Sequence, residues 1–131
     1  MGAVNWVAVI VGTVLFFAVG AVWYGALFAV PWQRLVGVGP AQRGLAAVRV
    51  VALTLLCEFL VVAMLAHLFA RTQPAPHVVM MMAVGFAVAV MAPALGINYL
   101  HQRKPVTLFL IDAGHLVVGM AIVGAVFVLL G

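Results

Sequence analysis

The chain has 131 residues, of which 69% are apolar and only 6% are charged, and its mean hydropathy is +1.37. A soluble domain carries about 25% charged residues, so this composition excludes an ordinary soluble fold and indicates an integral membrane protein. The formal net charge is +4. The basic residues lie in connections and near the ends of apolar segments, so we expect no nucleic-acid partner. Cys57 is the single cysteine, which excludes an intrachain disulfide.

Four apolar segments follow one another, each long enough to cross a bilayer, which takes about 20 residues in a helix. The expected spans are residues 4–30, 46–70, 77–99 and 106–130. Isolated strands would leave backbone groups unpaired in lipid, so the spans must be helices. The sequence therefore predicts a single membrane domain over residues 1–131, with an all-α fold: an antiparallel bundle of four transmembrane helices.

The first segment is preceded by no Lys or Arg, so it lacks the basic start of a signal peptide and we expect it to be retained. Within it, Ala21, Gly25 and Ala29 recur at every fourth position. Such a stripe of small residues allows helices to approach closely in lipid, so we assign it to helix packing. Aromatic residues near the two ends of the segment are expected to be interfacial anchors: Trp6, Trp23, Tyr24 and Trp32.

The connections differ in length. Residues 31–45 contain prolines and glycines and are expected to be the longest connection, in water. Two prolines stiffen the short turn between the second and third spans, which makes those spans antiparallel neighbours. In the third span, Pro93 cannot donate a backbone hydrogen bond and is expected to kink the helix.

Basic residues near the helix ends predict the orientation. Five of the six basic residues lie in or beside the first and third connections, which share one side of the membrane: Arg34, Arg43, Arg49, Arg103 and Lys104. The opposite side carries only Arg71. By the positive-inside rule, both termini are expected outside the cytoplasm.

Glu58 is the central polar residue of the second span, near the bilayer midplane. An acidic residue there costs roughly 2.5 to 3.5 kcal/mol and is expected to face other helices or a wet cavity. Counted from the cytoplasmic side, Glu58 and His115 lie at similar depths, about 18 and 14 Å. Asp112 shares a helix face with His115, and Thr54 lies one turn from Glu58. These four residues form the predicted intramembrane polar cluster.

The cytoplasmic ends of neighbouring spans bring further polar residues toward this cluster, namely Tyr24, Asn98 and Tyr99. Two interpretations compete. The titratable groups could carry protons or coordinate a cation, with pKa values shifted by burial and by one another. Alternatively, the residues form a hydrogen-bonded clasp that holds helices together, at about 0.6 kcal/mol per contact. Metal binding is less favoured because the candidate ligands follow no recognised spacing, and we assign no metal, cofactor or catalytic residue.

Two groups of residues carry a family resemblance. Asn5-Trp6, Gly20, Trp23-Tyr24-Gly25, Leu27-Phe28 and Trp32 stand in the first segment, and Ile111-Asp112-Ala113-Gly114-His115 with Gly124-Ala125 stand in the last. Together they resemble a family of small bacterial multi-pass membrane proteins known as domain of unknown function seventeen sixty-one. His115 stands where that pattern has a tyrosine. The resemblance implies four spans and a location in a bacterial inner membrane. It does not indicate an activity.

Three function classes remain. The first is an oligomeric transporter or channel subunit for a proton-linked small solute or cation, with Glu58 as the titrating group. Four short spans enclose a pathway poorly, so a homo-oligomer in the lipid bilayer is implied. The second is an accessory or assembly subunit of a larger membrane complex. The third, a membrane enzyme acting on lipid or thiol substrates, is least favoured because no nucleophile and base stand at a recognised spacing.

Overall fold

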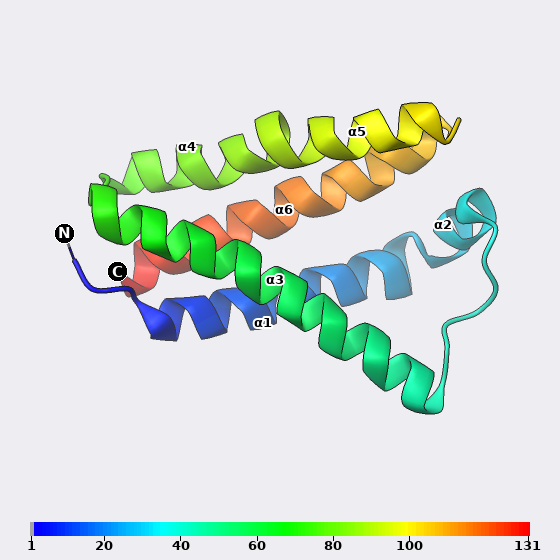
Figure 1. The fold of residues 1–131 in the computed structure, drawn as a ribbon, viewed down its shortest axis with the longest axis horizontal. Coiled ribbons are helices and arrows are strands. Elements are labelled where there is room, and N and C mark those ends of the chain that lie inside the picture. Colours follow the sequence, from blue (N-terminus) through cyan, green and yellow to red (C-terminus); the bar gives the residue numbers. More distant parts are fainter. Residues whose placement is uncertain (1) are drawn as a thin grey trace.

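The computed structural model describes residues 2–131 as a set of long helices (Figure 1). In chain order they are α1 (Trp6–Val22), the π-helical turn η1 (Trp23–Leu27), α2 (Ala29–Val36), α3 (Gly44–Thr72), α4 (Pro76–Phe86), the π-helical turn η2 (Ala87–Met91), α5 (Ala92–His101) and α6 (Val106–Leu130). Within residues 2–131, four stretches are long and apolar enough to cross a membrane: Trp6–Leu27, Gly44–Thr72, Pro76–His101 and Val106–Leu130. The predicted all-α membrane fold is confirmed.

Helices α1 and α6 form the centre of the bundle. Helix α1 packs against both α3 and α6, and α6 packs in turn against α4, η2 and α5. Both termini lie at one end of the molecule, and α2 lies at the other end with the α5–α6 connection (Figure 1). The first half of α3 extends away from the other helices, and none of its residues before Glu58 is buried. The bundle is therefore open along that half of α3.

The core lies between α1, α6, the second half of α3, and the helix formed by α4 and η2. The largest fully buried side chains are Phe16, Leu108, Met120, Val9, Val62 and Val123. Gly119 allows the close approach of α6 to α1, because a Cβ atom there would lie 2.7 Å from the ring of Phe16. Small residues thus pack the helices together, as expected where lipid gives no hydrophobic drive for association.

The first span ends earlier than the sequence predicts. The helix stops at Leu27, Phe28 leaves helical geometry at φ −125° and ψ 20°, and α2 begins at Ala29. Pro31 fits the first turn of α2 because the backbone N–H groups of a first turn have no intrahelical partner. The predicted span 4–30 and the predicted connection 31–45 are both corrected by this short helix.

The stripe of Ala21, Gly25 and Ala29 depends on a straight helix, which the break at Phe28 interrupts. A Cβ atom on Gly25 would meet nothing within 4 Å, and Ala21 is exposed. The stripe therefore contributes no close packing inside the chain. Its use in contacts between chains stays a prediction.

The third span is irregular close to Pro93. The π-helical turn η2 ends two residues before the proline, and in this turn the helix is wider than a regular α-helix. The kink expected at Pro93 stays a prediction. The spans at Gly44–Thr72, Pro76–His101 and Val106–Leu130 otherwise lie within two residues of their predicted bounds.

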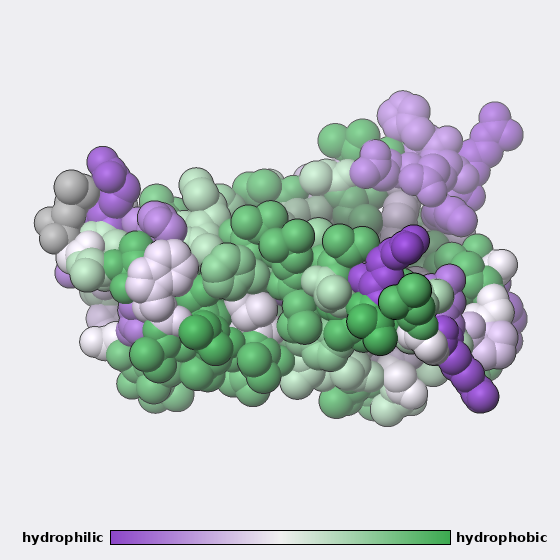
Figure 2. Space-filling view, turned by 60° about the horizontal axis from the view of Figure 1, so that its bottom comes forward, coloured by the Kyte–Doolittle hydropathy of each residue, from purple (hydrophilic) through white to green (hydrophobic). Residues whose placement is uncertain are grey.

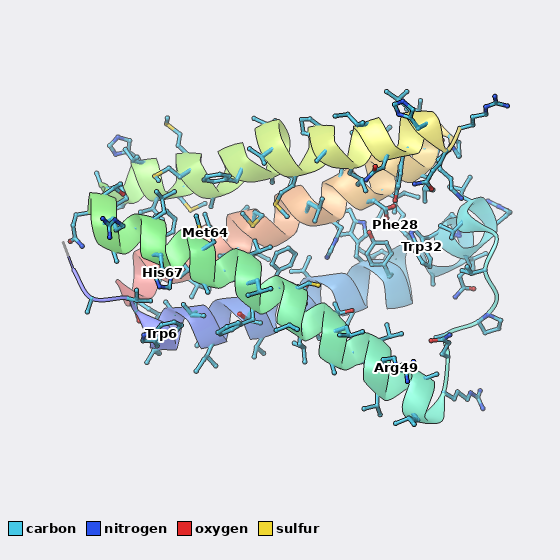
Figure 3. All side chains as sticks on the ribbon, in the orientation of Figure 1. Trp6, Phe28, Trp32, Arg49, Met64 and His67 are labelled. Atoms are coloured by element: carbon cyan, nitrogen blue, oxygen red, sulfur yellow. The ribbon has the colours of Figure 1, made fainter. Side chains whose placement is uncertain are left out.

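The surface has the hydropathy of a membrane protein. Most of its middle is apolar, and strongly hydrophilic residues gather mainly toward the two ends (Figure 2). Trp6 packs on α3, with its ring centroid 5.8 Å from that of His67 and 6.5 Å from that of Phe59 (Figure 3). At the same end, the Asn5 amide donates to the Leu130 carbonyl oxygen at 3.1 Å, which ties α1 to α6.

Candidate functional site

Asp112 on α6 is buried and accepts hydrogen bonds from three aromatic side chains. The Tyr24 hydroxyl donates to Oδ1 at 2.5 Å, and the Trp32 Nε1 group donates to the same oxygen at 3.0 Å. The Tyr99 hydroxyl donates to Oδ2. These donors come from η1, α2 and α5, so one carboxylate connects three separate elements to α6. We call this set of hydrogen bonds between Asp112 and its three aromatic donors the aromatic clasp.

The π-helical turn η1 and the break at Phe28 position this clasp. The turn directs two successive residues toward α6: Trp23 donates through Nε1 to the Ile111 carbonyl oxygen at 2.8 Å, and Tyr24 donates to Asp112. The change of direction at Phe28 then brings Trp32 back to the same carboxylate. The rings of Tyr24 and Trp32 pack edge to face, with centroids 5.2 Å apart.

Glu58 has a different environment. It is 8% exposed, stands midway along α3, and its Oε1 atom has no hydrogen-bond partner among residues 2–131. It lines a cavity of about 410 Å³ between α3, α1, α6 and η2. The cavity is lined by Phe16, Leu53, Thr54, Cys57, Glu58, Val61, Met91, His115 and Leu116. Glu58 thus lines the cavity, and its buried Oε1 atom is left without a hydrogen-bond partner among the described residues.

His115 forms part of the opposite wall of this cavity. Its ring packs between Phe16 and Tyr24, with centroid separations of 5.6 and 5.1 Å. Gly20 provides the space for the ring, because a Cβ atom there would lie 3.1 Å from His115 Nε2. That nitrogen is buried and also has no hydrogen-bond partner in the described chain. Two residues that line the cavity, one acidic and one imidazole, therefore each have a buried polar atom with no hydrogen-bond partner in residues 2–131.

The structure divides the predicted polar cluster into two parts. Asp112 joins Tyr24 and Tyr99 in the clasp, while Glu58 and His115 line the cavity. The remaining predicted residues are peripheral: the Thr54 hydroxyl donates to the Val50 carbonyl oxygen at 2.7 Å at the cavity wall, and Asn98 is exposed and lies outside both sites.

The sequence did not predict that two tryptophans hydrogen-bond to α6 at the clasp. Trp23 and Trp32 were expected only to anchor the chain in the interface, yet their indole N–H groups bond α6. A signal was present, because a buried indole N–H needs an acceptor and the only acidic residue of the last span stands near the same end.

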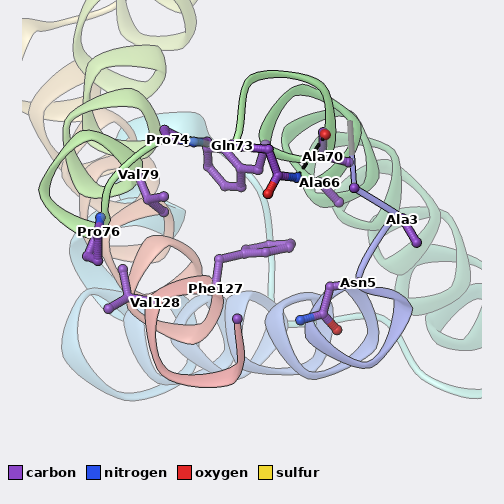
Figure 4. Close-up of a pocket in the computed structure, with 13 residues that line it drawn as sticks. Ala3, Asn5, Ala66, Ala70, Gln73, Pro74, Pro76, Val79, Phe127 and Val128 are labelled. Atoms are coloured by element: carbon purple, nitrogen blue, oxygen red, sulfur yellow. Dashed lines mark hydrogen bonds between the residues drawn. The ribbon is translucent and has the colours of Figure 1, made fainter.

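Two other possible sites are weaker. Residues 2–131 contain no group of three or more His, Cys, Asp or Glu placed to hold a metal ion. A cavity of about 490 Å³ lies beside the chain termini, between α3, α4 and the end of α6 (Figure 4). No charged side chain lines it, and the Gln73 amide at its rim donates to the Ala70 carbonyl oxygen at 3.0 Å. The cavity of Glu58 and His115 is therefore the better candidate.

Comparison with known proteins identifies a family. The family model described as "Protein of unknown function (DUF1761)" matches residues 7–128. No curated protein and no solved structure matches the chain. The match extends from the start of α1 to near the end of α6, so it includes the clasp and the cavity. The resemblance seen in the first and last segments is thus confirmed, and this chain is a membrane protein of the DUF1761 family.

Proposed function

We propose that this chain is a subunit of an oligomeric, proton-linked carrier for a small solute or cation, with Glu58 as the group that gains and loses the proton. The observation that carries the proposal is the carboxylate of Glu58, which lines a cavity in the middle of the membrane and has no hydrogen-bond partner in residues 2–131. An acidic residue at that depth is costly and marks a functional site by default.

The contrast with Asp112 supports this choice over the clasp. Asp112 accepts three hydrogen bonds and holds η1, α2 and α5 against α6. Glu58 accepts none at Oε1 and holds no other helix. A structural role would require such bonds, because an unpaired carboxylate in an apolar environment destabilises the fold. The two alternatives that the sequence left open are therefore best assigned to two different residues.

Proton exchange requires that Glu58 meets water or another titratable group. The cavity is also lined by His115 on α6, and an imidazole can exchange protons with a carboxyl group. The first half of α3 is not packed against the rest of the chain. A second copy of the chain against this half of α3 would enclose the cavity and complete a pathway, which is why the proposal includes an oligomer.

The proposed setting is the bacterial inner membrane with both termini outside the cytoplasm. The two connections rich in Arg and Lys lie at the end opposite the termini, as the positive-inside rule requires for this orientation (Figure 1). In this orientation, Asp112 lies toward the cytoplasmic end of α6 and Glu58 near the midplane.

Infrared titration of the carboxyl band tests the proposal. The protein is reconstituted in lipid, and the difference between the wild type and Glu58→Gln isolates the Glu58 signal from that of Asp112. We expect this signal to change with pH over the physiological range, and to shift its midpoint in His115→Ala because the imidazole lines the same cavity.

A Glu58 band that stays constant over that range would defeat the proton-carrier proposal. In that case the accessory or assembly subunit becomes the better account, with Glu58 paired to a residue of another protein. Asp112→Asn is the matched control, since it removes the other carboxyl group and must leave the Glu58 band in place.

A further inference from the structure

A second cavity, lined only by apolar residues, adjoins the cavity of Glu58. The second one has a volume of about 350 Å³ and shares Val61 and Met91 with the first. Its lining is Leu60, Val61, Met64, Leu65, Leu68, Phe86, Met91 and Met120. Ligand pockets have volumes of about 300 to 1,000 Å³, so the two together are large enough for a small organic molecule.

The polar end of this joined cavity is acidic and lacks a cation of its own. Glu58 is more than nine-tenths buried, and no Lys or Arg lines either cavity. Arg49, the nearest basic residue toward the start of α3, is about 13 Å away along the helix axis. His115 Nε2 lies against Gly20 of α1, and within residues 2–131 no ion pair joins it to Glu58. An ionised Glu58 therefore needs a positive group from outside the chain.

We infer that the joined cavity binds an amphiphilic organic monocation, with its charged group at Glu58 and its apolar body against Val61, Met64 and Met91. This inference rests on the proposed function and names the substrate class of the same site. A divalent inorganic cation fits poorly because it prefers six or more oxygen ligands, and this cavity offers one carboxylate and the hydroxyl of Thr54. A fatty acid or other anion would place its charge beside Glu58.

The open side of the bundle provides a route for such a ligand. None of the α3 residues before Glu58 is buried, and Leu53, Thr54 and Cys57 are exposed while they line the cavity. The opposite edge of the cavity is Met91, the last residue of the π-helical turn η2. In the single chain, an amphiphilic cation dissolved in the bilayer can therefore reach Glu58 sideways, between α3 and η2, before a second copy encloses the cavity.

A pair of ions of equal size and opposite charge tests the inference. Tetraphenylphosphonium and tetraphenylborate are each equilibrated with the protein in lipid nanodiscs, and nanodiscs holding Glu58→Gln correct for partition into lipid. We expect saturable binding of the phosphonium, weakened about tenfold or more in Glu58→Gln and largely restored in Glu58→Asp. The borate is expected to show no saturable binding. Equal binding of both ions, or phosphonium binding that is indifferent to Glu58→Gln, overturns the inference.

Cys57 supplies a second measurement that needs no variant. It is the single cysteine, it is exposed, and it lines the cavity beside Glu58. In detergent micelles, where the reagent alkylates Cys57 of the ligand-free wild type at a measurable rate, phosphonium is expected to slow this alkylation by N-ethylmaleimide, and borate is expected to leave the rate unchanged. An unchanged rate at saturating phosphonium counts against the inference even if Glu58→Gln fails to fold.

The outcomes also separate this inference from the proposed function. Phosphonium binding through Glu58 together with a carboxyl band that ignores pH supports the cation site and defeats the proton link. A carboxyl band that titrates, in a protein that binds neither ion, supports the proton link and overturns the cation site.

Discussion

Asp112→Asn tests how strongly the aromatic clasp stabilises the bundle. The carboxylate accepts hydrogen bonds from Tyr24, Trp32 and Tyr99 on its two oxygens, whereas an asparagine amide has one acceptor oxygen and an NH₂ group that cannot accept. Hydrogen bonds between helices in membranes contribute about 0.6 kcal/mol on average and about 1.7 kcal/mol at most. Loss of one or two of the three should lower the free energy of unfolding by about 1 to 3 kcal/mol. The upper part of this range is expected, because the substitution leaves buried donors without an acceptor.

Glu58→Gln is the matched comparison, since it makes the same chemical change at the other carboxylate. Glu58 has no hydrogen-bond partner at Oε1 in residues 2–131, so its substitution replaces an unpaired buried acid and breaks no clasp. The free energy of unfolding should stay the same or rise. Only Asp112→Asn is therefore expected to destabilise the protein, although both variants replace an acid by its amide.

Reversible unfolding in mixed detergent micelles, titrated with sodium dodecyl sulfate and followed by circular dichroism, measures both variants. A double-mutant cycle of Asp112→Asn with Tyr24→Phe should show coupling, because both substitutions remove the same hydrogen bond. If Glu58→Gln destabilises the protein as much as Asp112→Asn, the assignment of separate roles to the two carboxylates is wrong.

Three further predictions follow from packing and topology. Gly119→Ala should lower the free energy of unfolding by about 1 to 3 kcal/mol, because the new Cβ meets the Phe16 ring at 2.7 Å. Gly85→Ala is the control: a Cβ there meets nothing within 4 Å, so the same titration should show an unchanged or higher stability. Gly25→Leu should leave the fold of the single chain intact, and a reduced oligomer mass in light scattering would show that the small-residue stripe lies between chains. A reporter active only in the cytoplasm should stay silent when fused to Gly131; a strong signal would invert the topology.

Several features of the fold follow from local sequence because lipid leaves the chain few alternatives. Val106–Leu130 is helical over its whole predicted length because a long apolar run in a bilayer must satisfy its backbone hydrogen bonds internally. Four spans could thus be predicted from composition and segment length.

The candidate site could be predicted only as a set of residues. The sequence indicates that Glu58, Asp112 and His115 lie at comparable depths, because depth follows from position along a helix. It does not indicate which helix faces which, so one predicted cluster is two sites in the structure. Asp112 meets Trp32 only because the chain turns at Phe28, and no local pattern predicts that turn.

The sequence by itself determines that the chain lies in a lipid bilayer, that it has four spans, and how deep each polar group lies. These properties depend only on the hydrophobicity and length of single segments. Tertiary structure alone decides that Asp112 is bonded by three aromatic donors while Glu58 is left facing a cavity. That difference depends on contacts between residues as far apart as Tyr24 and Asp112, and on the divergence of α3 from the bundle. The physical reason is that hydrogen bonding of a side chain in lipid is decided by its neighbours on other helices, and those neighbours are set by packing.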